Sequence, residues 1–585
     1  MMKHTLLTAA IASALLLGGS ITVGISSADA AVVSLARPGQ GQLGKIKVNP
    51  YGHAPLSAVI NLQSKEPKDV VVTVRGKGKD GVPITYPVSR DIQQTHDGIP
   101  VFGLYADHSN EVQLNYVLDG KKVEEVYKIQ TQPIAGISVD GAVYSMPKVT
   151  PKVVKKGFED RLYWINHILM DNDSMDVMWS KGGALEWNRW PVNFITDTQG
   201  EPRWYLDANT IHDDNDVNKR GIVMGVHQVE NGDIIFAQGQ RYYRMDLLGR
   251  MIVERDLPRG YIDFSHAMTE LPNGNYLIRA AKKDYVRPDG VVTNTVRDHI
   301  LEIDQQGRLV EVWDLNKILD PMRDALLLAL DAKAVCLNVD DDAEAVSIEP
   351  DAPFGDHAGV GTGRNWAHVN SVDYDASDDS IVISPRHQAT AIKIGRDKEV
   401  KWILGPSEGW KGDLATKLLT PVDNRGKKLN CSPQGKCENT DFDFGYTQHT
   451  SWLVPEKGTL VTFDNGDGRY HEQPAFAEAK YSRGVEYKID EKNMTVKQLW
   501  EYGKDRGYEW YSPITSVTDY EADKDTMMMY FASAGLFSSE NTKPKLAEVK
   551  YGTQDVMVEL HVEAPTSKQP SYRAIVIRPD QAFGE

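Results

Sequence analysis

Short apolar segments alternate with polar turns along most of the chain. Six segments share one pattern: a strand-like run, a turn rich in Asp, Gly or Asn, and a second run with an aromatic or aliphatic residue near its end. They span residues 194–204, 245–253, 303–313, 392–402, 487–500 and 548–560. Alternation of apolar and polar positions around such turns is typical of β-hairpins. The pattern therefore predicts six antiparallel hairpins.

A second type of hairpin lies between these, with an apolar run on each side of a short polar turn. Its turns are at 231–232, 273–274, 377–379, 457–458 and 523–525. The two types alternate, which gives a repeating unit of four antiparallel strands. Radial repetition of such a unit protects the sheet edges of a β-propeller. We therefore predict an all-β chain with a six-bladed β-propeller over residues 141–585.

Residues 31–140 lack this repeat. They contain alternating runs such as Val70–Val74 and Val112–Tyr116 between Gly and Pro turns. This pattern favours a small antiparallel β-sandwich. The sequence does not decide whether such a domain is a spacer, a dimerisation element or a wall of a site.

The first 30 residues have the features of a signal peptide. Lys3 precedes the apolar run of residues 6–17, and Ala28-Asp29-Ala30 offers small residues for cleavage. The run is too short for a membrane span of ~20 residues. We therefore expect export to the periplasm, with no membrane anchor after cleavage. An exported chain can form disulfides.

Composition narrows the classes of partner. The chain has 65 Lys and Arg against 82 Asp and Glu, a formal charge of -17, and an ordinary share of hydrophobic residues for a folded protein. This charge opposes binding to phosphate backbones, so no nucleic acid partner is expected.

Three cysteines are present. Cys431 and Cys437 enclose a compact turn with Pro433 and Gly435, which predicts a disulfide between them. A loop this short shapes a local segment more than it stabilises the whole fold. Cys336 is left over and is expected to be a free structural thiol.

Four histidines occupy one phase of the repeat, at or just before the strand that leads into the second type of turn. They are His227, His266, His368 and His449. In a propeller this strand is the innermost of its blade, so side chains at its start converge on the central channel. A single such histidine would more often be structural, but four in one phase favour a functional site.

Asn370, two residues after His368, and Arg386, which follows the predicted strand at 380–384, extend this set. Imidazoles, an amide and a guanidinium together can bind an oxyanion and donate protons to it. Histidines alone could instead hold copper or zinc, so a metal site stays open as an alternative.

At this point a family resemblance appears. The segments 265–274, 366–370, 384–388 and 444–452 resemble those of bacterial arylsulfate sulfotransferases, and the Cys431/Cys437 loop also matches. The resemblance covers essentially the whole mature chain. It implies an exported enzyme with no nucleotide sulfate donor, in which a six-bladed propeller follows an N-terminal β-sandwich domain.

The resemblance also implies roles for individual residues. His449 would be the nucleophile and become transiently sulfated, and His266 would act as the general acid and base at the phenolic oxygen. The sulfuryl oxygens would be bound by His368, Asn370 and Arg386, and Thr515 and Tyr572 would line the substrate pocket. A covalent intermediate lets one site serve donor and acceptor in turn.

The sequence therefore predicts transfer of a sulfuryl group from a phenolic sulfate ester to a phenol by a ping-pong route, with no cofactor and no metal. The family suggests a homodimer. Two alternatives remain at this stage: a propeller oxidoreductase with copper or zinc on the histidines, and a propeller that only binds a partner.

Overall fold

The computed structural model describes residues 43–139, 142–169, 190–213, 215–216, 218–330, 354–472, 479–537, 542–563 and 570–584. The predicted signal peptide and Cys336 lie outside these residues. Within them strands predominate and the helices are short, so the prediction of an all-β fold is confirmed. No helix in this part of the chain is long and apolar enough to cross a membrane.

Two sheets form the N-terminal part. One has the order β1-β2-β5 and the other β4-β3-β6-β7. The strands are β1 (Ile46–Val48), β2 (Ser57–Asn61), β3 (Lys68–Val74), β4 (Ile84–Val88), β5 (Gly98–Phe102), β6 (Ser109–Leu118) and β7 (Lys121–Gln130). Helix α1 (Arg90–His96) follows β4, and the Ser89 side chain caps its N-terminus. The predicted strands at 70–74 and 112–116 lie in β3 and β6, which pair with each other.

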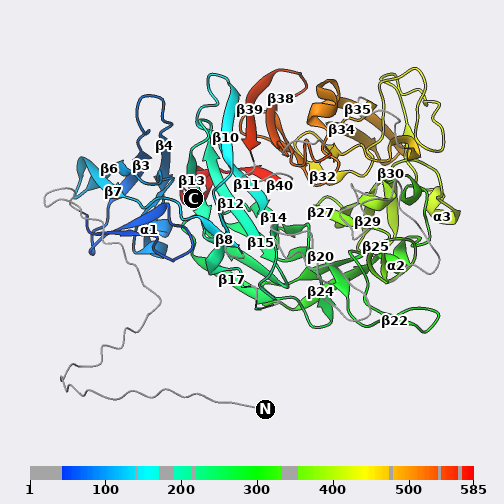
Figure 1. Ribbon diagram of the computed structural model, residues 1–585, viewed down its shortest axis with the longest axis horizontal. Helices are drawn as coiled ribbons and strands as arrows, with labels where there is room; N and C mark the ends of the chain where they lie inside the picture. Colours follow the sequence, from blue (N-terminus) through cyan, green and yellow to red (C-terminus); the bar gives the residue numbers. More distant parts are fainter. Residues whose placement is uncertain are drawn as a thin grey trace, which may run out of the picture.

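Six further antiparallel sheets follow, each with four strands in the repeat (Figure 1). Sheet 1 has β40 (Ser571–Val576), β11 (Leu162–Leu169), β12 (Trp190–Asp197) and β13 (Pro202–Leu206); sheet 2 has β14 (Val223–Gln228), β15 (Ile234–Gln238), β16 (Arg241–Met245) and β17 (Met251–Asp256); sheet 3 has β19 (Met268–Glu270), β20 (Tyr276–Lys282), β23 (His299–Ile303) and β24 (Leu309–Asp314). Sheet 4 has β27 (Val369–Asp375), β28 (Ser380–Pro385), β29 (Ala391–Gly395) and β30 (Val400–Leu404); sheet 5 has β32 (His449–Val454), β33 (Thr459–Asp464), β34 (Arg483–Asp490) and β35 (Thr495–Tyr502); sheet 6 has β36 (Val517–Glu521), β37 (Thr526–Phe531), β38 (Lys545–Lys550) and β39 (Val556–Glu563). All eleven predicted hairpins are present in these sheets.

Smaller elements lie at the edges and in the connections. Strands β10 (Lys148–Val154), β18 (Tyr261–Ile262) and β31 (Thr420–Pro421) extend sheets 6, 3 and 5, and three two-stranded sheets pair β8 (Ile137–Val139) with β9 (Ala142–Tyr144), β21 (Tyr285–Val286) with β22 (Val292–Thr293), and β25 (Gly355–Ala358) with β26 (Arg364–Asn365). The remaining helices are α2 (Leu315–Ile318), α3 (Gly412–Ala415) and α4 (Pro579–Phe583), with 3-10 turns η1 (Ala208–Thr210), η2 (Leu327–Ala329), η4 (Arg386–Gln388), η5 (Arg469–His471) and η7 (Lys504–Trp510).

Sheet 1 is completed by the C-terminal end of the chain. Its hairpin β11–β12 comes early, and β40 pairs antiparallel with β11. The sequence repeat contains six hairpins of the first type but five of the second, and this pairing explains the difference. Sheet 1 therefore receives its edge strand, β40, from a segment about 400 residues after β11.

The first strands of successive sheets contact one another in a cycle. The order of contact is β40, β14, β19, β27, β32, β36 and β40 again. We call these six the facing strands. In Figure 1 the sheets follow one another around the molecule in chain order, from turquoise through green and yellow to red.

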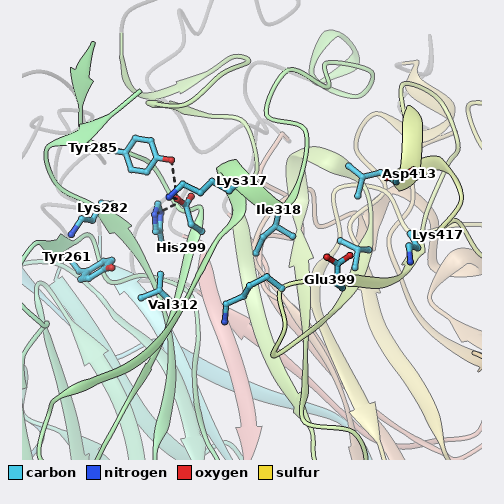
Figure 2. A pocket seen from close by; sticks show the side chains of 14 residues that line it. Tyr261, Lys282, Tyr285, His299, Val312, Lys317, Ile318, Glu399, Asp413 and Lys417 are labelled. Atoms are coloured by element: carbon cyan, nitrogen blue, oxygen red, sulfur yellow. Dashed lines mark hydrogen bonds and ion pairs between the residues drawn. The ribbon is translucent and has the colours of Figure 1, made fainter. Parts of the chain in front are cut away.

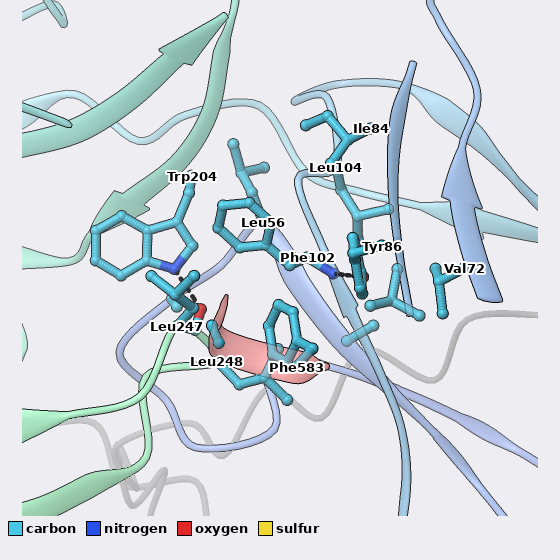
Figure 3. Close-up of a cluster of buried hydrophobic side chains, with 14 of the residues drawn as sticks. Leu56, Val72, Ile84, Tyr86, Phe102, Leu104, Trp204, Leu247, Leu248 and Phe583 are labelled. Atoms are coloured by element: carbon cyan, nitrogen blue, oxygen red, sulfur yellow. Dashed lines mark hydrogen bonds between the residues drawn. The ribbon is translucent and has the colours of Figure 1, made fainter. Parts of the chain in front are cut away.

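The N-terminal sheets share a hydrophobic core with sheets 1 and 2 (Figure 3). Helix α4 takes part, because Phe583 packs with its ring centroid 4.8 Å from that of Tyr86. The Trp204 indole donates to the carbonyl of Leu247 at 2.8 Å, which satisfies its N–H inside this core. The C-terminus is thereby held against the N-terminal part.

The predicted disulfide between Cys431 and Cys437 is present. The two residues also form an isolated antiparallel bridge, so the loop between them is a tight hairpin. This loop lies in the connection between sheets 4 and 5, just before the segment that leads to His449.

Candidate active site

Irregular backbone surrounds the start of the facing strands. The ladder shifts register by a bulge at equivalent places in three of them: between Met224 and His227, between Val369 and Val372, and between His449 and Ser451. Bulges re-aim side chains and are common beside active sites.

Several residues here also have left-handed backbone conformations. They include His266 (φ 72°), His368 (φ 48°), Thr450 (φ 74°), Thr515 (φ 56°) and Ser516 (φ 88°). Such conformations cost about 1–3 kcal/mol each in residues other than glycine and persist where the surrounding structure imposes them. Their concentration here shows that the surrounding structure imposes backbone conformations that these residues do not favour on their own.

Three of the four predicted histidines meet. The ring centroid of His266 lies 5.1 Å from that of His368 and 5.8 Å from that of His449. The Tyr572 ring, from β40, lies 5.4 Å from His449 and 5.9 Å from His266. All four side chains are buried. Strands from sheets 1, 3, 4 and 5 therefore bring together residues that are more than 300 positions apart.

His227 is placed differently from the prediction. Its ring makes an edge contact with Trp452, with centroids 5.3 Å apart. The ring contacts among the described residues do not join it to the other three histidines. His227 lies after the bulge of β14, whereas His449 lies before the bulge of β32, and the repeat phase alone does not reveal this difference.

His449 is fixed as one tautomer by the backbone. Its Nδ1 lies 2.9 Å from the carbonyl oxygen of Ser516. A carbonyl can only accept, so Nδ1 carries the proton and Nε2 keeps its lone pair. The lone pair of Nε2 is therefore free of this hydrogen bond.

His368 is fixed as the opposite tautomer. The amide nitrogen of Asn365 lies 2.9 Å from His368 Nδ1 and donates to Asp356 at 2.6 Å. The carboxylate requires a donor, which identifies that amide atom as nitrogen. His368 Nδ1 therefore accepts, and its Nε2 carries a proton that can be donated to an anion.

Burial and nearby arginines keep these rings neutral. The pKa of His449 is well below its ordinary value, first because the ring is buried and then because Arg573 and Arg386 are close. Burial, followed by the charge of Arg297, lowers the pKa of His266 in the same way. A neutral imidazole is the form that can act as a nucleophile or accept a proton.

Two of the guanidinium groups are held by main-chain carbonyls. Arg386, in η4, donates to the carbonyls of Thr447 and Pro513, the second at 2.9 Å. Arg573 donates to the carbonyl of Asn370 at 2.6 Å, and its Nε and Nη1 have no partner among the described residues. A buried guanidinium with donors to spare suits an anionic substrate.

The Asn370 side chain makes hydrogen bonds to the backbone on both sides of His449. Its Nδ2 donates to the carbonyl of Gln448 at 2.7 Å, and its Oδ1 accepts from the backbone N–H of Thr450 at 3.2 Å. Thr515 is buried in the adjacent loop, where its hydroxyl donates to the carbonyl of Ile514 at 2.6 Å.

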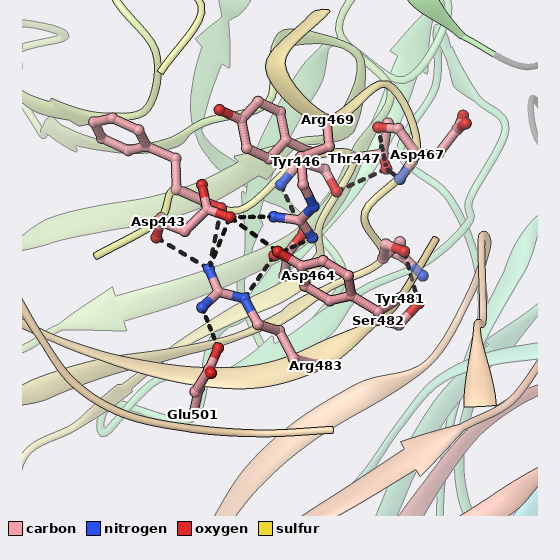
Figure 4. A network of polar contacts seen from close by, with 12 residues as sticks. Asp443, Tyr446, Thr447, Asp464, Asp467, Arg469, Tyr481, Ser482, Arg483 and Glu501 are labelled. Carbon is pink, nitrogen blue, oxygen red and sulfur yellow. Dashed lines mark hydrogen bonds and ion pairs between the residues drawn. The ribbon is translucent and has the colours of Figure 1, made fainter. Parts of the chain in front are cut away.

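A buried ionic network supports the segment that precedes His449 (Figure 4). Arg483 and Arg469 both donate to Asp464, at 2.9 and 2.8 Å, and Arg469 also pairs with Asp443 at 2.7 Å. Asp464 in turn accepts from the backbone N–H of Tyr446. The network therefore fixes the path of the chain three residues before His449.

A surface cavity of about 700 Å³ lies elsewhere, beside sheets 3 and 4 (Figure 2). Its lining includes Tyr261, Lys282, Tyr285, His299 and Lys317. None of the predicted site residues lines this cavity.

Sequence analysis missed several groups that act on the histidines. Asn365, Ser516 and Arg573 were given no role, although Asn365 stands three positions before His368 and Arg573 follows Tyr572 directly. Their proximity to predicted residues was the available signal. Contacts made through a backbone carbonyl, as at Ser516, leave no trace in residue type.

Comparison with known proteins defines the class. The arylsulfotransferase (ASST) model matches residues 148–573, and the arylsulfotransferase Ig-like domain matches residues 45–132. The chain belongs to the arylsulfotransferase family. It is 49% identical over 586 residues to the arylsulfate sulfotransferase AssT of Escherichia coli, with 96% of this chain and 98% of the relative covered. It is 47% identical over 603 residues to the arylsulfate sulfotransferase AssT of Lelliottia amnigena, with 99% of both chains covered.

Among solved structures, the likenesses are distant. A periplasmic gluconolactonase of Pseudomonas aeruginosa covers 71% of this chain at 9% identity, with a TM-score of 0.32.

Proposed function

We propose that this protein is an arylsulfate sulfotransferase that transfers a sulfuryl group from a phenolic sulfate ester to a phenol through a sulfated histidine, without a nucleotide donor. Membership of the family and near full-length identity to two arylsulfate sulfotransferases support the activity. The observation that carries the mechanism is the set of tautomers, with a lone pair on His449 and a proton on the Nε2 of His368.

In the first half-reaction, His449 Nε2 attacks sulfur and the bond from sulfur to the phenolic oxygen breaks. His266 donates its ring proton at that oxygen as negative charge develops there, and the phenol leaves. The ring, neutral before this step, is left with a negative charge near Arg297 and Arg279 until the second half-reaction returns a proton. His368 and Arg386 stabilise charge on the sulfuryl oxygens, by analogy with phosphoryl transfer. In the second half-reaction an acceptor phenol gives its proton to His266 and takes the sulfuryl group from His449.

Tyr572 and Thr515 would line the space for the aryl groups. Tyr572 is well placed for this role, because its ring touches both His266 and His449. Asn370 would act on the site mainly through the main chain beside His449.

We also propose that the six sheets form a six-bladed propeller closed by β40, and that residues 141–585 constitute this domain behind a β-sandwich at 31–140. The cycle of contacts among the facing strands supports closure, and the match of residues 45–132 to an Ig-like domain supports the sandwich.

A signal peptide at 1–30, export to the periplasm and a homodimer complete the proposal. Light scattering at several concentrations tests the homodimer.

The test is incubation with a chromogenic aryl sulfate, with and without an acceptor phenol. The expected result is steady release of phenol that depends on the acceptor, and one sulfuryl group on His449 when the acceptor is omitted. His449→Asn should neither gain the group nor release phenol. Sulfated peptide that maps to another residue would overturn the assignment of the nucleophile.

The same assay separates the alternatives. Release without acceptor would indicate a sulfatase, and no release with any donor would indicate a binding protein. Metal analysis of the purified protein tests the copper or zinc oxidoreductase. The comparisons favour the transferase over these three other classes.

A further inference from the structure

The residue before His266 has a hydroxyl group in contact with that ring. Ser265 Oγ lies 2.5 Å from His266 Nδ1, and both side chains are almost fully buried, at 3% and 2% exposed. This distance is at the short end for a hydrogen bond from a hydroxyl group. The direction of the bond decides which nitrogen of His266 carries the proton.

Arg279, from β20, sets that direction. Its Nη2 donates to Ser265 Oγ, and its Nε donates to the Ser265 carbonyl at 3.1 Å. A guanidinium can only donate, so Ser265 Oγ accepts from Arg279 through one of its lone pairs. Among the described residues the only other hydrogen-bond partner of this hydroxyl is His266 Nδ1, so the hydroxyl proton is directed to that nitrogen. His266 Nδ1 is the contacting acceptor, and the proton of the neutral ring is then on Nε2.

Asp263 holds Arg279 in place. The two form a buried ion pair of 3.0 Å between Arg279 Nη1 and the carboxylate, and Arg279 is fully buried. Asp263 is itself anchored, because its backbone N–H donates to the Gln240 side chain at 2.7 Å. The guanidinium is therefore fixed from two sides, through Asp263 and through both oxygens of Ser265.

We propose that Ser265, held by Arg279 and Asp263, is a positioning residue that keeps the proton of His266 on Nε2, where it can be donated to the phenolic oxygen. This inference rests on the proposed function and deepens it. In the other tautomer a lone pair of Nε2 would face the lone pairs of that oxygen, and the leaving phenol would lose its donor. His368 reaches the same tautomer through Asn365, so the two donors of the site are set by different groups.

Loss of the correct His266 tautomer should slow the reaction to an extent that depends on the acidity of the leaving phenol. Phenols that are already acidic leave with little help, whereas weakly acidic phenols need the donor. Ser265→Ala should therefore slow donors with weakly acidic phenols by ~10–10² fold, less than the ~10²–10⁴ fold expected for His266→Asn. Donors with acidic phenols should react at near the normal rate in both variants.

The experiment measures phenol release over a series of aryl sulfates of graded phenol acidity, in wild type, Ser265→Ala, Ser265→Thr and His266→Asn. Ser265→Thr keeps a hydroxyl and should restore the wild-type dependence on acidity. Ser371→Ala is the matched control, because it removes a buried hydroxyl that accepts from the backbone of Ser451 and contacts no histidine ring in the described structure. It should leave the dependence on acidity unchanged.

A second readout does not depend on turnover. Nitrogen NMR of protein labelled with ¹⁵N-histidine should show the His266 proton on Nε2 in wild type, and a mixture of tautomers in Ser265→Ala. A Ser265→Ala protein with an unchanged tautomer, or with equal slowing of acidic and weakly acidic phenols, would overturn the inference. If His266→Asn shows the selective loss while Ser265→Ala does not, the inference fails and the proposed function stands. If wild type sulfates no histidine, the proposed function fails instead.

Discussion

Asn370 ties down the backbone on both sides of His449. Its amide makes hydrogen bonds to the backbone of residues 448 and 450, at 2.7 and 3.2 Å, so it fixes the position of the His449 backbone between them. Displacement of a reacting group by about 1 Å can cost ~10² fold in rate.

We therefore predict that Asn370→Ala lowers kcat by ~10–10² fold for acidic and weakly acidic phenols alike, because His449, the proposed nucleophile, moves. Steady-state kinetics with two donors of different acidity check this. A large rise in KM with unchanged kcat would show instead that Asn370 serves mainly to bind sulfuryl oxygens.

His387 provides a test of stability against pH. Burial, and then the charge of Arg386, lowers its pKa to about 3 from an ordinary value of 6.5. Between these values the unfolded chain binds a proton that the folded chain does not, so acid favours unfolding. Stability from this group is lost as the pH falls from 6.5 towards 3.

We predict that His387→Gln reduces the loss of unfolding free energy between pH 7 and pH 5 by about 2 kcal/mol relative to wild type. Denaturant unfolding at the two pH values measures the difference. An equal loss in wild type and variant would contradict the neutral, buried state of His387.

The site was predictable where residue type carries the chemistry. His266, His368, His449 and Arg386 are visible because their side chains recur in one phase or in family motifs. The tautomers were not visible, because Ser516 acts through its carbonyl and Arg279 acts through Ser265. Such contacts depend on the bulges and left-handed residues of the fold, which have no fixed signature in the sequence.

At the level of elements, the disulfide loop is connected to the segment that carries His449. The Tyr446 hydroxyl donates to the carbonyl of Gln434 inside the loop at 2.8 Å. The next residue, Thr447, offers its carbonyl to Arg386. The Cys431–Cys437 loop therefore supports the site through Tyr446.

We predict that replacing both cysteines by serine lowers activity by ~10 fold while the thermal midpoint changes little, because a short loop adds little chain entropy on closure. Tyr446→Phe, which keeps the disulfide, should lower activity in the same direction. Assays of activity and melting on both variants test this. A large drop in melting temperature with normal activity at low temperature would contradict it.

The strands were the most predictable elements. Turn residues and alternation located the eleven hairpins, because each hairpin is local in sequence. The pairing of β40 with β11 was not seen in advance, since it joins strands about 400 residues apart and leaves no local pattern.

Across the whole molecule, a buried ion pair joins the first and last sheets. Arg161, just before β11, pairs with Glu548 on β38 at 2.6 Å and with Asp523 at 2.6 Å, and Arg161 and Glu548 are 3% and 0% exposed. Removing one member of a buried pair leaves the other charge without compensation.

We predict that Arg161→Ala costs about 3–5 kcal/mol of unfolding free energy. The exposed pair of Arg75 and Glu111 is the matched control, and Arg75→Ala should cost about 0–1 kcal/mol. Denaturant unfolding compares the two. Similar losses in both variants would show that the junction of first and last sheets contributes no special stability.

The placement of β40 also affects the order in which the parts of the site are synthesised. Tyr572 and Arg573 lie in the last strand of the chain, and that strand fills the open position beside β11. A growing chain therefore holds His266, His368 and His449 long before it holds their aromatic and cationic neighbours. Ribosomal products that stop short of residue 571 lack Tyr572, Arg573 and strand β40 of sheet 1, so this part of the site forms only after β40 has been synthesised.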